Sequence, residues 1–180
     1  MGFTIYQVNI QNFIKNKYAL AIDVSHYNAD IIFLNETGTV KEKQLKLAGY
    51  KSMGIKNIAN DGMAIFIKYH FQIEYLHFPN NDLLAVKIFT NLGPIILATA
   101  YAPPRHYSLP DISLAKLFSH NCPVLFIGDL NARHYILNNL PPGAYPNSKG
   151  NQIHNTINRY NLKILGPNFH TFITARHVIR

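Results

Sequence analysis

The heptapeptide IIFLNET, residues 31–37, joins two kinds of sequence in one short stretch. Its first four residues, from Ile31 to Leu34, are all apolar, which is typical of a central strand buried on both faces of a sheet. Asn35, Glu36 and Thr37 follow at once. Because packing does not need a carboxylate directly after a buried strand, the stretch predicts a strand that delivers Glu36 to a sheet edge.

Two other apolar runs, residues 3–8 and 124–127, end in the same way. The first is followed by Asn9 and the second by Gly-Asp-Leu-Asn at residues 128–131. Each polar residue taken alone is also typical of a turn or a helix cap. If the three strands are neighbours, however, one rim collects four oxygen-bearing side chains: Asn9, Glu36, Asp129 and Asn131.

Carboxylate and amide oxygens are the ligands that hard cations such as Mg²⁺ or Mn²⁺ prefer. A zinc site is not expected, because the chain has one cysteine and no pair of histidines at ligand spacing. The rim therefore predicts a site for Mg²⁺ or Mn²⁺.

The rest of the chain mixes predicted helices and strands. Helices are expected at residues 14–27, 41–47, 111–119 and 150–160. Strands are expected at residues 63–68, 71–78, 83–89, 94–101, 162–165 and 171–173. This order favours a layered α/β or α+β domain with antiparallel pairs, and 180 residues fit one domain better than two.

The composition narrows the class of protein. A hydrophobic content of 48% excludes a disordered or fibrous chain, and the single Cys122 suits a reducing compartment. No apolar run approaches the roughly 20 residues of a membrane span, and we see no secretory signal. A net charge of +8 favours polyanionic partners, nucleic acid first, although a solvated basic surface is the alternative.

Four short motifs carry a family resemblance. They are VNIQNF at residues 8–13, IIFLNET at 31–37, YAPP at 101–104 and GDLNARH at 128–134. In this order the chain resembles the endonuclease/exonuclease/phosphatase superfamily from Phe3 to about Arg176. Within that superfamily it is most similar to the abasic-endonuclease-like domain of non-LTR (LINE-type) retrotransposon polyproteins.

The resemblance implies a four-layer α/β/β/α sandwich of two mainly antiparallel sheets flanked by helices. It implies a hydrolase: an endonuclease that uses magnesium (or Mn²⁺) to cut a DNA phosphodiester, so that the nick primes reverse transcription. The implied partners are DNA and a reverse transcriptase domain in the same polyprotein, with no membrane. The implied location is intracellular and nuclear.

The resemblance also assigns roles at the rim. Glu36 would be the principal metal ligand and Asn9 a supporting ligand. Asp129 would position or deprotonate the attacking water. Asn131 would contact the scissile phosphate, and Tyr101 would hydrogen-bond that phosphate or assist the leaving oxygen.

Two further residues of the GDLNARH motif, Arg133 and His134, are expected to contact the nucleic-acid backbone. The alternative for each is an ordinary surface residue without a role in binding. Among the smaller departures, Asn35 stands where the family commonly has Gln, and Gln11 where abasic-site repair enzymes carry an acid. The amide at Gln11 argues against the repair branch of the superfamily.

The family pattern also continues with a Ser-Asp-His motif that this sequence lacks, since none of its nine histidines follows an Asp. We therefore expect residues 1–180 to form one C-terminally incomplete domain that lacks the last strands and turns over weakly. Two alternatives stay open beside the DNA endonuclease: a phosphatase or RNA-acting branch of the superfamily, and a catalytically decayed nucleic-acid-binding module.

Overall fold

The computed structural model describes residues 2–38, 40–55, 62–80, 82–105, 108–137, 140 and 142–165. The chain forms two compact units. The first comprises Met1–Pro103 and Pro110–Asp129, and the second comprises Pro104–Leu109 and Leu130–Arg180. The prediction of a single, incomplete domain stays a prediction.

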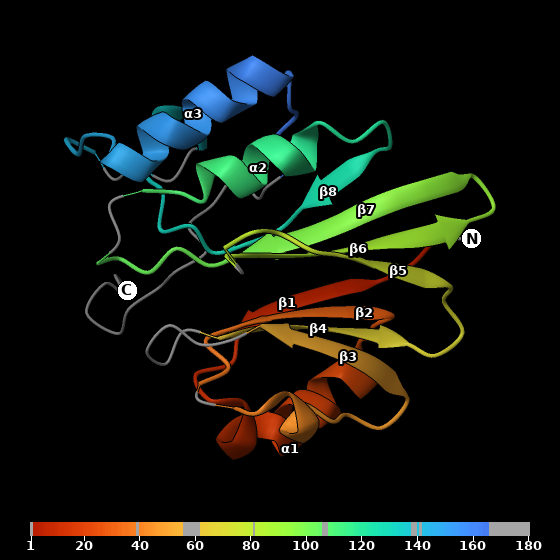
Figure 1. The fold of residues 1–180 in the computed structure, drawn as a ribbon. Coiled ribbons are helices and arrows are strands. Elements are labelled where there is room, and N and C mark those ends of the chain that lie inside the picture. The colour runs from red at the N-terminus through yellow and green to blue at the C-terminus, as the bar shows by residue number, and fades with distance from the viewer. Residues whose placement is uncertain are drawn as a thin grey trace. The chain divides into compact units, whose positions relative to one another are not determined.

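The first unit contains two four-stranded sheets (Figure 1). Sheet A has the order β1 (Ile5–Asn9), β2 (Ile31–Asn35), β4 (Met63–Lys68) and β3 (Tyr50–Ile55). Sheet B has the order β5 (Ile73–Leu76), β6 (Leu83–Thr90), β7 (Gly93–Ala100) and β8 (Val124–Phe126). The pairs β1–β2 and β7–β8 are parallel and the other four pairs are antiparallel.

Strand β2 is buried at every position because both of its faces are covered. Ile31 and Phe33 point into the core between the sheets, where they join residues of β4, β6 and β7. Ile32 and Leu34 point the other way, into a second core beneath α1 (Phe13–His26). The alternation of a strand's side chains thus explains why β2 needs an apolar residue at each position from 31 to 34.

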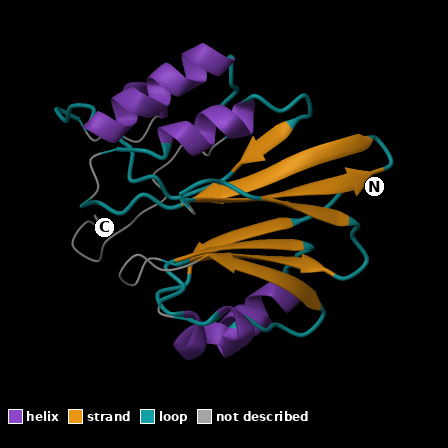
Figure 2. Cartoon of the chain, in the orientation of Figure 1, coloured by secondary structure: helices purple, strands orange, loops and turns teal. Residues whose placement is uncertain are grey.

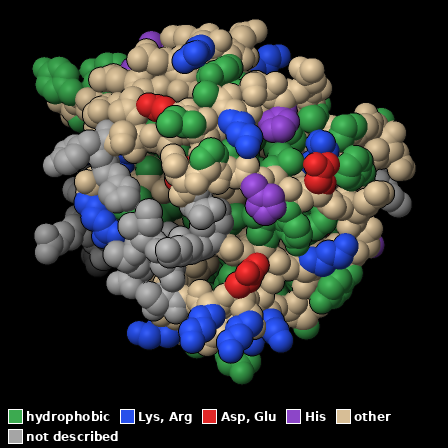
Figure 3. All heavy atoms as spheres, viewed as in Figure 1, with side chains coloured by type: hydrophobic (Ala, Val, Ile, Leu, Met, Phe, Trp, Pro, Cys, Tyr) green, Lys and Arg blue, Asp and Glu red, His purple; other side chains and the backbone are tan. Residues whose placement is uncertain are grey.

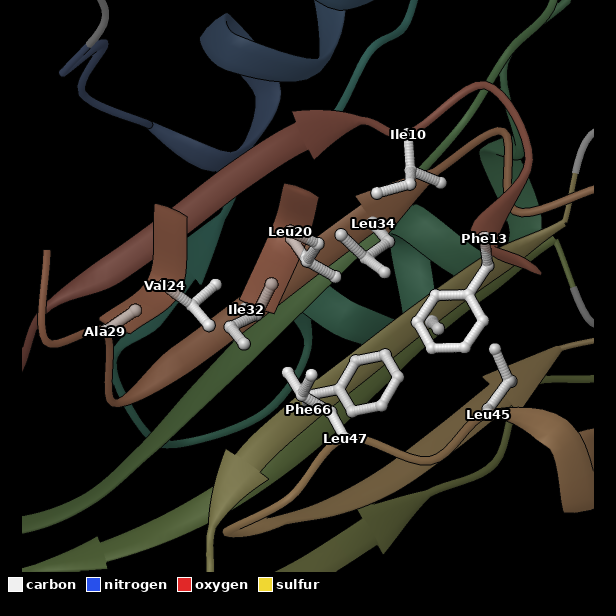
Figure 4. Close-up of a cluster of buried hydrophobic side chains, with 11 residues drawn as sticks. Ile10, Phe13, Leu20, Val24, Ala29, Ile32, Leu34, Leu45, Leu47 and Phe66 are labelled. Atoms are coloured by element: carbon white, nitrogen blue, oxygen red, sulfur yellow. The ribbon is translucent and has the colours of Figure 1, made fainter. Parts of the chain in front are cut away.

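Helix α1 covers the outer face of sheet A. It begins after Asn12, whose side-chain oxygen accepts a hydrogen bond from the Lys15 N–H, as an N-cap requires. Phe13 is fully buried, and its ring stacks on that of Phe66, with the ring centroids 5.5 Å apart. Figure 4 shows this core between the helix and the sheet.

Helix α2 (Asp111–Phe118) lies on the outer side of sheet B (Figure 2). Its Phe118 ring meets the edge of the Phe126 ring from β8, and its Ser113 hydroxyl donates to Asp82 at 2.5 Å. The order of layers is α1, sheet A, sheet B and α2. The predicted four-layer sandwich with mainly antiparallel sheets is therefore confirmed.

The second unit is built around α3 (Ser148–Tyr160), with the 3-10 turn η2 (Tyr135–Leu137) before it. Helix α3 ends at Asn161, which adopts a left-handed conformation with φ of 50°. The strand predicted at residues 162–165 is wrong: this segment has no regular structure, and 78% of Leu165 is exposed. The strand predicted at 171–173 lies outside the described residues.

The structure differs from the sequence-based expectation at two other places. The helix predicted at 41–47 is only the 3-10 turn η1 (Glu42–Gln44), although Leu45 and Leu47 are buried. Strand β3 was not predicted, because its sequence YKSMGI mixes charged, polar and apolar residues without a clear period. No helix in the described part of the chain is long and apolar enough to cross a membrane.

The substitution Phe66→Ala tests the core between α1 and sheet A. Phe66 is fully buried, so its truncation should lower the free energy of unfolding by about 3–5 kcal/mol. Phe89→Ala is the matched control, because Phe89 is 42% exposed, and it should cost about 1 kcal/mol or less. Urea denaturation of both variants measures the difference, and equal losses would contradict the assigned core.

Candidate active site

Four side chains from separate elements meet at one end of the two sheets of the first unit. Asn9 is the last residue of β1, and Glu36 follows the end of β2. Tyr101 follows β7 and pairs with Asp129 in a parallel bridge beyond β8. Because β1–β2 and β7–β8 are both parallel pairs, each sheet brings two carboxyl-terminal strand ends side by side.

The side-chain amide of Asn9 lies between the two carboxylates. Its Nδ2 donates to Glu36 Oε1 at 3.2 Å and to Asp129 Oδ2 at 2.8 Å. The Tyr101 hydroxyl donates to the same Glu36 Oε1 at 3.0 Å. All four side chains are half-buried. The prediction that the strand ends converge is thus correct for Asn9, Glu36 and Asp129, and the structure adds Tyr101 to them.

The backbone at Glu36 turns sharply out of β2. Glu36 has a φ of 57°, in the left-handed region that costs a non-glycine residue energy. Hydrogen bonds on both sides hold this turn: the Asn12 N–H donates to the Glu36 carbonyl at 2.8 Å, and the Thr37 N–H donates to the Gly62 carbonyl at 2.9 Å. The sharp turn therefore fixes where the carboxylate leaves the sheet.

Gly128 lets the chain after β8 approach β7 closely enough to place Asp129. A Cβ at this position would lie 2.3 Å from the Ala100 carbonyl oxygen and 3.0 Å from its nitrogen. The Ala102 N–H then donates to the Asp129 carbonyl at 2.9 Å. The glycine of the GDLN sequence is thus needed for packing, and the aspartate beside it reaches Asn9.

Buried polar groups lie in the sheets directly behind this cluster. Asn35, in register with Asn9, and Thr99, two residues before Tyr101, are fully buried. Within the described residues, neither the Asn35 amide nor the Thr99 hydroxyl has a hydrogen-bond partner. Buried polar groups are normally paired, with protein or with water. Two such groups therefore lie next to the cluster along the chain, Asn35 one residue before Glu36 and Thr99 two residues before Tyr101.

The donor set fits a hard divalent cation. The carboxylates of Glu36 and Asp129 and the amide of Asn9 offer only oxygen ligands, which Mg²⁺ and Mn²⁺ prefer and zinc does not. The described segments hold no group of three or more His, Cys, Asp or Glu side chains placed to hold a metal ion, so this set is limited to two carboxylates and an amide.

The other three predicted site residues, Asn131, Arg133 and His134, belong to the second unit. Arg133 is exposed and His134 is half-buried. The His134 ring stacks on His154, with the ring centroids 4.5 Å apart, and its Nδ1 accepts from the Ile136 N–H at 3.2 Å.

Asn147 organises this segment, and the sequence analysis missed it. Its Oδ1 accepts from the Arg133 N–H at 2.9 Å and from the Gly150 N–H at 2.7 Å, while its Nδ2 donates to the Asn131 carbonyl at 2.8 Å. One N-cap side chain thereby fixes both the start of α3 and the backbone of residues 131–133. An Asn directly before the helix is the signal that would have found it.

The family model described as "Endonuclease/Exonuclease/phosphatase family" matches residues 6–161. The chain belongs to this family. Members are hydrolytic nucleases and phosphatases, and the resemblance seen in the motifs is confirmed. A search of curated protein sequences gave no match.

Solved structures share the fold at low sequence identity. The endonuclease domain of TRAS1, a telomere-specific non-LTR retrotransposon, matches with a TM-score of 0.73 and 20% identity over 98% of this chain and 79% of its own. The AP endonuclease LMAP from Leishmania major matches with a TM-score of 0.66 and 15% identity, over 88% and 67%. ANGEL2, a 2′,3′-cyclic phosphatase, matches with a TM-score of 0.53 and 16% identity, over 72% and 53%.

The substitution Gly128→Ala tests how Asp129 is placed. The added methyl group collides with the backbone of Ala100, which cannot move without separating β8 from β7. We expect the free energy of unfolding to fall by about 1–3 kcal/mol. Gly143→Ala is the control, because a Cβ there meets nothing within 4 Å, although its φ of 77° adds about 1 kcal/mol of strain. Thermal and urea denaturation should show Gly128→Ala as the larger loss, and a neutral effect would contradict the close approach.

Proposed function

We propose that this chain is a magnesium- or manganese-dependent DNA endonuclease that hydrolyses phosphodiester bonds. Its setting would be the nucleus, beside a reverse transcriptase domain of the same polyprotein. The observation that carries the proposal is the hydrogen-bond network in which Asn9 joins Glu36 to Asp129 and Tyr101 joins it through Glu36. Similarity of fold to a retrotransposon endonuclease domain supports DNA as the substrate.

Each residue of the network has a task in this reaction. Glu36 and Asn9 would hold the cation, which, when bound, supplies positive charge at the phosphoryl oxygens. Asp129 accepts hydrogen bonds, so it suits a base that orients a water molecule and takes its proton. The Tyr101 hydroxyl is a donor that suits a phosphate oxygen or the leaving oxygen.

The residues of the second unit would serve binding. We assign Asn131 to the scissile phosphate, and Arg133 and His134 to the strand backbone. A net charge of +8 would draw the polyanion to the protein and make affinity fall as salt rises.

A second candidate is a nucleic-acid-binding module without turnover. The net charge of +8 suits such a module as well as an enzyme, because attraction of a polyanion needs no catalytic residue. A third candidate is another branch of the same family, a phosphatase or an enzyme that acts on RNA. The similarity in fold to ANGEL2, a 2′,3′-cyclic phosphatase, supports the phosphatase. The same set of variants separates these candidates.

A plasmid-nicking assay with Mg²⁺, with Mn²⁺ and with EDTA tests the proposal. Glu36→Gln and Asp129→Asn should each lower nicking by about 10²–10⁴-fold, since they remove a ligand and a base. Mg²⁺ should also raise the melting temperature of the wild type, and Glu36→Gln should abolish that rise.

The matched control is Glu74→Gln, because Glu74 is an exposed carboxylate paired with Lys87 on sheet B. This variant should nick like the wild type. Nicking that persists in EDTA or in Glu36→Gln would contradict the proposed site. DNA binding without any nicking, unchanged in Glu36→Gln, would favour the binding module, and cleavage of RNA or phosphate monoesters alone would favour the other branches.

A further inference from the structure

The charges of the chain are divided unevenly between the two units. By sequence, the second unit has seven Lys and Arg residues and no Asp or Glu, whereas the first unit has ten Lys and Arg residues and nine Asp and Glu residues. Nearly all of the net charge of +8 therefore belongs to the second unit. Repulsion between like charges lowers the stability of a compact unit, and a bound polyanion relieves that repulsion.

Helix α3 presents one continuous exposed face in this unit. Residues three and four apart lie on the same side of a helix, and the exposed residues of α3 follow that spacing: Ser148, Asn151, Asn155, Asn158 and Arg159. The opposite side packs through Ile153, which is buried. Figure 3 shows Lys or Arg side chains where Figure 1 draws the end of this helix. The exposed face of α3 thus carries amides and a cation, and no acidic or apolar side chain.

Several groups on this face are placed to meet a ligand. The Arg159 guanidinium carbon lies 5.4 Å from the centre of the Tyr160 ring, a contact that limits the positions of the cation. Lys163 is exposed just beyond the end of the helix. Within the described residues, the side-chain amides of Asn151 and Asn155 make no hydrogen bond to the protein, so their donors and acceptors face solvent.

The chemistry of this face fits duplex DNA better than other partners. Amide and guanidinium groups bind phosphates and base edges, and the major groove of DNA is wide enough for an α-helix. The major groove of an RNA duplex is too narrow for a helix. An unpaired strand binds by stacking on aromatic rings, and a protein partner needs apolar or aromatic anchors. The exposed face of α3 offers neither.

We infer that the exposed face of α3 binds duplex DNA in its major groove, with Arg159 at a phosphate and the amides of Asn151 and Asn155 at phosphates or base edges. This inference rests on the proposed function, since it takes the duplex to be the substrate of the endonuclease. Asn147 caps α3 and also holds the backbone of residues 131–133. A duplex on α3 therefore contacts the same unit that carries Arg133. The helix would supply affinity that does not depend on the active-site cation.

Fluorescence anisotropy in EDTA tests this surface without cleavage. The probes are a short fluorescein-labelled DNA duplex and an RNA duplex of the same sequence and length. Asn151→Asp and Asn155→Asp keep the shape of the side chain and add a negative charge, so each should weaken binding of the DNA duplex by roughly 5-fold at low salt. Arg159→Gln should reduce the slope of log affinity against log salt by about 0.9. Binding of the RNA duplex should change much less, because its groove excludes the helix.

Two variants of the first unit serve as matched controls. Asn91→Asp makes the same change of charge in the exposed turn between β6 and β7, and Lys15→Gln removes an exposed cation from α1. Both should bind the DNA duplex like the wild type, and all five variants should keep the wild-type melting temperature because the residues are exposed. Wild-type affinity of the α3 variants for the DNA duplex, an equal loss on both duplexes, or an equal loss in the controls would overturn the inference.

The nicking assay separates this result from the proposed function. Nicking that depends on Glu36, together with duplex binding that does not depend on Asn151, Asn155 or Arg159, would overturn the role of α3 and leave the endonuclease in place. Duplex binding through α3 without any nicking would support the surface and reject the enzyme.

Discussion

The side-chain amide of Asn9 holds carboxylates from two different sheets, and the candidate site depends on that contact. The 3.2 Å hydrogen bond to Glu36 lies within sheet A, whereas the 2.8 Å bond to Asp129 crosses to sheet B, so the second bond forms only if the sheets are packed at the right distance. That distance is set by the core between them, where Ile31 and Phe33 meet residues of sheet B. A well-packed core resists small changes in spacing. Packing in the middle of the sandwich is therefore what places the chemistry at its end.

The direction of the strands decides which end carries the site. Most neighbours in both sheets are antiparallel, and an antiparallel pair sends its carboxyl ends to opposite edges. Among the strands that the structure describes, only β1–β2 and β7–β8 are parallel, and these two pairs carry Asn9, Glu36, Tyr101 and the segment leading to Asp129. Each parallel pair places two carboxyl-terminal strand ends at the same end of its sheet. These ends of the two sheets face each other across the sandwich.

Much of this arrangement was predictable from the sequence because strand ends leave a local signature. Apolar runs that stop at a polar residue placed Asn9, Glu36 and Asp129 correctly, whereas Tyr101 came only from the family resemblance. Local sequence patterns failed where the structure of a segment is decided by contacts with residues far away in the sequence. Strand β3 has no clear period and is held by its pairing with β4, while the apolar residues at 162–165 lack a regular structure. The role of Asn147 depends on contacts with residues 131 and 133, which no local pattern contains.

Several energetic costs in the first unit lie at or beside the candidate site. Among the described residues the polar groups of Asn35 and Thr99 have no partner, and burial in that state costs about 1–3 kcal/mol for each. The left-handed backbone of Glu36 costs about 1–3 kcal/mol more. Apolar residues at 35 and 99 would extend the inter-sheet core and remove the first cost. A glycine at 36 would remove the second. Selection for stability alone would favour apolar residues at 35 and 99 and a glycine at 36. Because the sequence has none of these three residues at positions that lie close together, we infer that this end of the sandwich is kept for binding or chemistry. That argument uses only packing and hydrogen bonds, and it reaches the same residues as the family motifs.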